Sequence, residues 1–206
     1  MKLHWSPRSP FVRKVMIFAH EVGLAGRIEL VRTPVAMSQA NRELLRVNPV
    51  GKIPTLITDE GEALFDSTVI CEYLDSLHGG PQYFPQAARE RWRALRWHAL
   101  GDNMLDNLII WRNETLRPKA RQSTVMLAAL ETKIRSSLAY LDAGAAALGK
   151  APISIGHVGI GTALGYLDFR FPALAWRDGH PDIAAWYGTF SQRPSIRNTL
   201  PVDDGK

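Results

Sequence analysis

The chain has 206 residues, of which 46% are apolar, and a formal charge of +5 at pH 7. This length fits one large domain or two small ones, and it can bury a core without metal or disulfide cross-links. Its one cysteine, Cys71, excludes an intrachain disulfide and suits a reducing, cytoplasmic location. We expect neither a secretory signal nor a membrane span, because no apolar run is long enough for either.

Strand and helix patterns alternate through the first 78 residues. Strands are predicted at 2–5, 27–31, 55–58 and 62–65, and helices at 10–22, 38–46 and 67–77. This β-α-β-α-β-β-α order predicts an α+β domain with a thioredoxin-like fold over residues 1–78. Such a domain has a four-stranded mixed sheet with helices on both faces.

The stretch 79–85 is rich in glycine and proline and predicts a linker. Beyond it the apolar spacing is helical throughout, with helices predicted at 86–115, 122–148, 154–169 and 181–192. The sequence therefore predicts a second, all-α domain over residues 86–206.

The excess of positive charge falls after residue 80. Arg89, Arg93 and Arg96 share one face of the first predicted helix of the second domain. A solvated helix face explains this spacing, whereas a nucleic-acid site needs a broader basic surface with aromatic residues or a groove-reading helix. We expect no nucleic-acid partner.

Ser9-Pro10 forms a corner between a strand and a helix. Serine suits the N-cap and proline the first helical position, so a helix cap is one reading of this pair. The other is that the Ser9 hydroxyl stabilises a bound thiolate beside the positive end of the helix. Ser6 is a rival hydroxyl nearer the strand.

A second candidate site lies between Lys52 and Ser67. Pro54 begins a strand, and a cis bond before it would turn the Ile53 N–H and C=O outward to pair with a peptide. Lys52 could reach a carboxylate of that peptide. At Asp66-Ser67, a helix cap again competes with a role in binding, in which Ser67 holds a carboxylate and Asp66 meets an ammonium group.

Other catalytic chemistries lack their residue patterns. Cys71 lies among apolar residues on a predicted helix and reads as core, and the absence of a CxxC pair argues against disulfide exchange. The six histidines are scattered without ligand spacing, so we assign no metal.

Four segments together resemble the soluble glutathione S-transferase family, in particular its serine-type bacterial members. They are SPFVRKV (residues 9–15), NPVGKIPTL (48–56), DSTVICEYL (66–74) and HPDIAAWYGTFSQRPSIRNT (180–199). Their order and spacing match the family over almost the whole chain.

This resemblance implies a homodimeric enzyme that uses glutathione as cosubstrate and takes a small hydrophobic electrophile in an acceptor site lined by the helical domain. By position, Ser9 would stabilise the thiolate and Ile53, beside Pro54, would bind the cysteinyl backbone. Asp66 and Ser67 would hold the γ-glutamyl end, and Lys52 the glycyl carboxylate. Three apolar residues on the helix after residue 86 could equally line the acceptor site or belong to the core: Met104, Leu108 and Trp111.

The resemblance leaves the reaction open. Conjugation of the thiolate to an electrophile is the leading hypothesis. A glutathione-dependent isomerase, dehalogenase or ether-cleaving enzyme is a related alternative. The remaining alternative is a binding or regulatory module that keeps the fold without turnover.

One position departs from the family pattern. The core helix of the family usually opens with Ser/Thr-x-x-Asp, a capping box, but this chain has Ser154 and His157 there. Because histidine accepts a backbone hydrogen bond only when neutral, we expect His157→Asp to stabilise the protein by roughly 0.5–1 kcal/mol.

Overall fold

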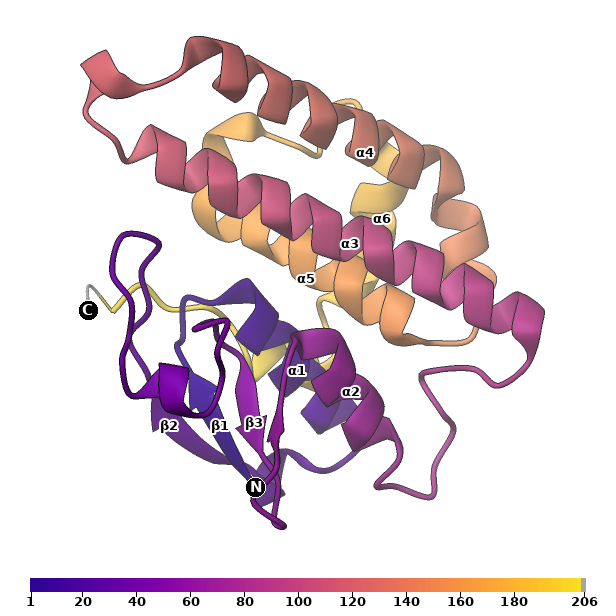
Figure 1. Cartoon of the computed structure of the whole chain (residues 1–206). Coiled ribbons are helices and arrows are strands. Elements are labelled where there is room, and N and C mark those ends of the chain that lie inside the picture. The colour runs from indigo at the N-terminus through magenta and orange to yellow at the C-terminus, as the bar shows by residue number, and fades with distance from the viewer. Residues whose placement is uncertain (205–206) are drawn as a thin grey trace. The chain divides into compact units, whose positions relative to one another are not determined.

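The computed structural model describes residues 1–204, which form two compact units (Figure 1). One unit comprises Met1–Phe84 together with the chain from Pro194 onward, and the other comprises Pro85–Arg193. The sequence analysis expected the helical domain to continue to the end of the chain. In the structure, the segment after Arg193 instead belongs with the first unit.

A four-stranded mixed sheet forms the centre of the first unit. Its strands are β1 (Lys2–Trp5), β2 (Glu29–Arg32), β3 (Thr55–Ile57) and β4 (Ala63–Leu64), in the order β2-β1-β3-β4. Strand β1 is parallel to β2 and antiparallel to β3, and β3 is antiparallel to β4. This topology confirms the predicted thioredoxin-like fold.

The helices of the first unit pack around α1. They are α1 (Pro10–Glu21), α2 (Ser67–Asp75) and the short α7 (Pro194–Arg197), and both α2 and α7 contact α1. Leu3 of β1, Leu56 of β3 and Phe18 of α1 are all 0% exposed. The alternating strands and the apolar stripe of α1 thus bury their apolar sides in one core.

The helix predicted at 38–46 is absent, so this prediction was wrong. The segment is largely irregular and contains only a 3₁₀ turn at Leu44–Arg46. The Asn41 side chain accepts hydrogen bonds from the N–H groups of Glu43 and Leu44, at 3.1 and 3.0 Å. Only Leu44 is buried among residues 38–46, so the segment lacks the apolar stripe that holds a helix on a sheet.

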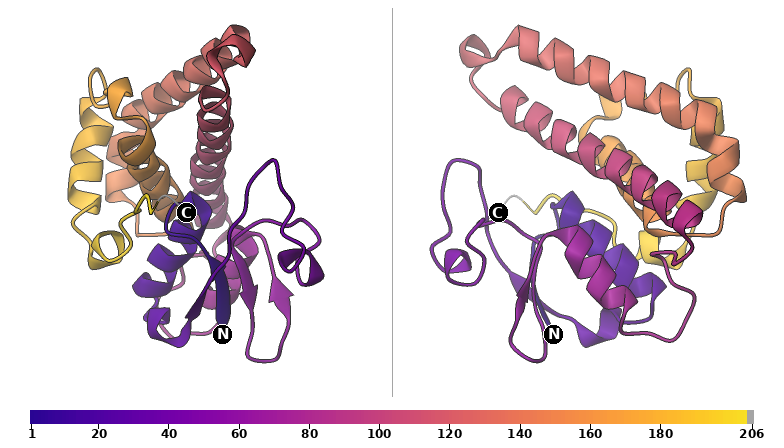
Figure 2. Two further views of the ribbon diagram at one scale, coloured as in Figure 1. Left: turned by 90° about the vertical axis from the view of Figure 1, so that its left-hand side faces the viewer. Right: turned by 45° about the vertical axis from the view of Figure 1, so that its right-hand side comes forward.

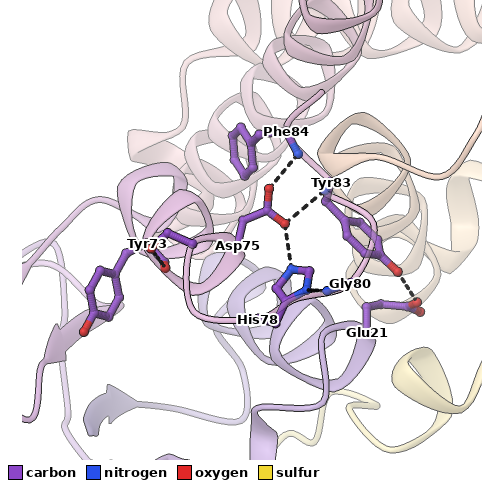
Figure 3. A network of polar contacts seen from close by, with 8 residues as sticks. Glu21, Tyr73, Asp75, His78, Gly80, Tyr83 and Phe84 are labelled. Atoms are coloured by element: carbon purple, nitrogen blue, oxygen red, sulfur yellow. Dashed lines mark hydrogen bonds and ion pairs between the residues drawn. The ribbon is translucent and has the colours of Figure 1, made fainter. Parts of the chain in front are cut away.

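A buried carboxylate fixes the chain that follows α2 (Figure 3). Asp75, 3% exposed, accepts from the N–H groups of Tyr83 (3.0 Å) and Phe84 (2.9 Å) and pairs with His78 Nε2 (3.0 Å). The Tyr83 hydroxyl donates to Glu21 at 2.8 Å, and Glu21 also accepts from Ser195. The sequence predicted a linker here, and these contacts anchor both of its ends to the first unit.

Four long helices build the second unit: α3 (Ala88–Thr115), α4 (Thr124–Lys150), α5 (Ile155–Arg170) and α6 (Pro181–Phe190). Single 3₁₀ turns lie at Lys119–Arg121 and Pro172–Leu174, and another lies in the first unit at Ala25–Arg27. Every residue from Ile155 to Leu167 is buried, so α5 is the central helix of the unit. The predicted all-α character is confirmed.

Glycines allow α5 to lie close against its neighbours. A Cβ atom added to Gly101 of α3 would stand 2.4 Å from the carbonyl carbon of Gly159, and one added to Gly156 would stand 2.7 Å from Trp97 Cβ. Neither position has room for a methyl group. The glycines of α5 therefore serve close helix packing.

His157 completes the capping box at the start of α5. Its Nδ1 accepts from the Ser154 N–H at 3.0 Å, and its Nε2 lies 3.0 Å from the Leu148 carbonyl oxygen at the end of α4. These two bonds require the neutral tautomer with the proton on Nε2. Burial lowers the pKa of His157 below its usual 6.5, which favours that neutral form. The histidine thus links two helices, a role that an aspartate has no donor to perform.

Within residues 1–204, no helix is both long and apolar enough to cross a membrane.

Candidate functional site

Strand register brings the predicted site segments to one edge of the sheet. His4 of β1 lies opposite Thr55 of β3, so the chain leaving β1 toward Ser9 runs beside the chain entering β3. Leu64 of β4 lies opposite Leu56, which places the chain leaving β4 at that same edge. Ser9, Ile53-Pro54 and Asp66-Ser67 therefore occupy three neighbouring connections of the first unit.

Ser9 is the N-cap of α1 and is partly exposed. Its Oγ accepts from the Val12 N–H at 3.3 Å, and its own N–H donates to the Ser6 carbonyl at 3.2 Å. Because the oxygen serves as an acceptor toward the helix, the hydroxyl proton is left to donate elsewhere. The cap and the thiolate-stabilising role are thus compatible in one side chain.

The rival hydroxyl, Ser6, has a different environment. Its Oγ accepts from Arg32 Nη1 at 2.9 Å and from the Arg8 N–H at 3.5 Å. Ser6 precedes α1 by several residues and does not cap it. The geometry favours Ser9 as the hydroxyl at the positive end of the helix.

The segment before β3 forms a fixed corner at Ile53, which is only 7% exposed. The Ile53–Pro54 peptide bond is cis, as the sequence suggested. Among residues 1–204, the N–H and C=O of Ile53 have no hydrogen-bond partner. An extended peptide could therefore pair with Ile53 without displacing any contact of the fold.

Asn48 shapes that corner, although the sequence analysis did not single out its role. This residue is 1% exposed, and its Nδ2 donates to the Lys52 carbonyl (3.1 Å) and to Thr55 Oγ1 (2.8 Å). Its Oδ1 accepts from the Val50 N–H at 2.9 Å. With its backbone held in this way, Lys52 extends an exposed side chain into solvent.

Asp66 and Ser67 open α2 as the sequence suggested. The Asp66 carboxylate is exposed and accepts from the Thr68 N–H at 2.9 Å, so it caps the helix through one oxygen. Ser67 is 1% exposed and begins the first turn. The preceding Phe65–Asp66 peptide bond is also cis, and the sequence did not predict this.

The residues suggested for an acceptor site in the second unit divide into two groups. Met104 and Leu108 are 1% and 0% exposed and belong to the core. The Trp111 ring packs against Phe171, with centroids 5.0 Å apart. Cys71 is buried, and no three His, Cys, Asp or Glu side chains of residues 1–204 are grouped to hold a metal.

Sequence reasoning also missed Arg8 and Arg32, which lie beside Ser6 at the same sheet edge. Trp5 of β1 is paired with Arg32 of β2, so β2 ends where β1 does. Asp203 and Asp204, almost 200 residues away in sequence, meet these arginines. Only the fold brings these charges together.

Comparison with known proteins identifies the family of the chain. Residues 8–77 match the glutathione S-transferase N-terminal domain, and residues 86–189 match the C-terminal domain of that family. The GST-like protein YibF of Escherichia coli K12 is 33% identical over 205 residues, which cover 98% of each chain. The chain belongs to the glutathione S-transferase family.

Solved structures show the same fold. A glutathione transferase family member from Pseudomonas fluorescens Pf-5, crystallised with bound glutathione, is 41% identical with a TM-score of 0.94, and the match covers 98% of this chain and 99% of that one. A second structure from that organism holds S-(propanoic acid)-glutathione, at 41% identity and a TM-score of 0.90, with 98% and 100% covered.

Proposed function

We propose that this protein is a glutathione transferase that joins the glutathione thiolate to a small electrophile. The observation that carries the proposal is the Ser9 hydroxyl, which accepts from the first turn of α1 and keeps its proton for a bound sulfur. One hydrogen bond to the thiolate and the helix dipole together are sufficient to lower a thiol pKa of ~8.5 toward neutrality, a change worth roughly 2–3 kcal/mol. The thiol proton leaves to solvent, and the sulfur lone pair attacks a carbon of the electrophile. At an aryl halide the halide ion then leaves, and at an activated double bond the displaced electron pair takes a proton from water.

The remaining site residues would bind glutathione along the sheet edge. Ile53, presented by cis-Pro54, pairs with the cysteinyl backbone, and Lys52 meets the glycyl carboxylate. At the start of α2, Ser67 and Asp66 receive the γ-glutamyl group, with the Ser67 hydroxyl and N–H on its carboxylate and Asp66 on its ammonium. Residues 1–78 would thus form the glutathione-binding domain, and the helical residues 86–193 would supply the acceptor side, in a homodimer located in the cytoplasm.

The relatives support glutathione as the cosubstrate. One family member with 41% identity was crystallised both with glutathione and with its S-(propanoic acid) derivative. In the second ligand the sulfur substituent carries a carboxylic acid. We infer that the acceptor side of the present site also admits a small acid.

Calorimetry with glutathione and turnover of a generic aryl halide test the proposal. We expect binding and turnover in the wild type, and a glutathione Kd raised roughly three- to tenfold in Lys52→Gln, since one charge-assisted contact is lost. Lys2→Gln is the matched control, because Lys2 pairs with Glu29 within the sheet. Binding without turnover of any electrophile would indicate a non-catalytic module, and absence of binding would refute the proposal.

A further inference from the structure

The chain from Asn198 to Asp204 returns to the sheet edge that carries the candidate site. After α7, the trace runs to the end of the sheet opposite the N-terminus (Figure 2). The Val202 N–H donates to the Pro7 carbonyl at 3.2 Å, which places this tail directly on the loop before Ser9. Two carboxylates follow, Asp203 and Asp204.

Both carboxylates meet a pair of arginines. Asp204 Oδ2 lies 2.6 Å from Arg32 Nη2, and its Oδ1 lies 3.4 Å from Arg8 Nε. Asp203 Oδ1 lies 3.7 Å from Arg8 Nη1. The Asp204 carboxylate therefore lies between two guanidinium groups, with a close contact to Arg32 and a longer one to Arg8.

The arginine pair is held in part by contacts that do not involve the tail. Arg32 donates to Ser6 Oγ at 2.9 Å, and its guanidinium lies 5.7 Å from the centre of the Trp5 ring. The Arg8 and Arg32 side chains remain 32% and 31% exposed with the tail in place. A carboxylate that replaced the tail would find at least Arg32 already oriented.

The position of this pair relates it to the proposed chemistry. Arg8 is adjacent to Ser9, and the Ser6 carbonyl accepts from the Ser9 N–H. Ser6 therefore contacts both Arg32, through its hydroxyl, and Ser9, through its carbonyl, which places the arginine pair on the same turn as the proposed thiolate-binding hydroxyl. Ion pairs of partly exposed groups are weak, so the tail is readily displaced.

We propose that Arg8 and Arg32 form a subsite for the carboxylate of an acidic electrophile, and that Asp203 and Asp204 occupy it until the electrophile binds. The proposal rests on the glutathione transferase function argued above and specifies its substrate class. An α,β-unsaturated carboxylate fits. The thiolate sulfur bonds to the β-carbon, the electron pair of the double bond moves to the α-carbon, and that carbon takes a proton from water.

Acrylate and its neutral counterpart acrylamide are the probes. The ratio of their kcat/KM values with glutathione is compared between variants, so that their different intrinsic reactivities cancel. In Arg8→Gln/Arg32→Gln we expect the acrylate-to-acrylamide ratio to fall about three- to tenfold, because the carboxylate loses two partly exposed charged partners. In Asp203→Asn/Asp204→Asn we expect it to rise about two- to fivefold, because the competing charges are removed.

Arg27→Gln is the matched control, because Arg27 pairs with Asp59 away from this site. It should leave the ratio unchanged. If the double arginine variant keeps the wild-type ratio while it still binds glutathione, the subsite is refuted and the transferase function stands. If the wild-type protein fails to bind glutathione at all, both proposals are overturned.

Discussion

The two units of the molecule are stabilised by different kinds of contact. In the first, polar side chains fix irregular backbone: Asp75 holds the segment after α2, and Asn48 holds the corner before β3. In the second, apolar helices approach so closely that glycines are required where α3 and α5 meet. The difference follows from the elements of each unit. The candidate site residues lie on loops, which need polar contacts to keep one shape, whereas a helical core needs only surfaces that fit together.

The largest expected effect concerns the helix contact of the second unit. Gly101→Ala places a methyl group 2.4 Å from the Gly159 backbone, and we expect the free energy of unfolding to fall by about 3 kcal/mol. Gly144→Ala in α4 is the matched control. No atom lies within 4 Å of the added methyl group, so alanine should stabilise the helix by roughly 0.5–1 kcal/mol. Chemical denaturation of both variants measures the contrast, and equal effects would show that the contact is not tight.

The second prediction concerns the polar anchor of the first unit. Asp75→Asn replaces one acceptor oxygen by an NH₂ group, which leaves at least one buried N–H of Tyr83 or Phe84 without a partner. We expect a loss of about 2 kcal/mol. Hydrogen exchange of these two amides should accelerate. Unchanged protection would mean that the carboxylate does not hold this segment.

His157 is an exception in the second unit, because it is a polar side chain whose hydrogen bonds join two helices of an otherwise apolar core. Its bond to the Leu148 carbonyl reverses the expectation drawn from sequence. An aspartate could cap Ser154 but would lose that bond and carry a buried charge, so we now expect His157→Asp to lower the free energy of unfolding by about 1–2 kcal/mol. A higher melting temperature in the variant would contradict this role.

The same histidine predicts a dependence of stability on pH. Its pKa in the folded state is lowered from 6.5 by burial, so the unfolded chain takes up a proton first as the pH falls. Its contribution should be complete above about pH 6.5 and decline below that value, toward the lowered folded-state pKa. The stability of His157→Gln should fall less steeply between pH 6.5 and 5, and parallel profiles would rule out this contribution.

Local signals in the sequence predicted most of the fold. Proline and serine at the start of α1, and Asp66 before α2, are caps whose hydrogen bonds form within a few residues, so the sequence alone reveals them. The prediction of a helix at 38–46 was wrong because the turn at Asn41 and the burial of Leu44 alone, without an apolar stripe, decide the structure of this segment.

The candidate site was predicted only in part, for the same reason. Ser9, Ile53 and Asp66 belong to short motifs that carry their own geometry. The contacts of Arg8 and Arg32 with Asp203 and Asp204 join residues far apart in sequence, and so does the hydrogen bond between Tyr83 and Glu21. Such pairings depend on the tertiary fold, which no local pattern encodes.

The central claim is that Ser9 stabilises the thiolate of bound glutathione. Ultraviolet titration of the enzyme–glutathione complex measures the pKa of the bound thiol directly, with Ser6→Ala as the control for the rival hydroxyl. We predict a pKa roughly two units below the ordinary thiol value of about 8.5 in the wild type and in Ser6→Ala, and a rise of at least about one unit in Ser9→Ala. An unchanged pKa in Ser9→Ala would contradict the claim.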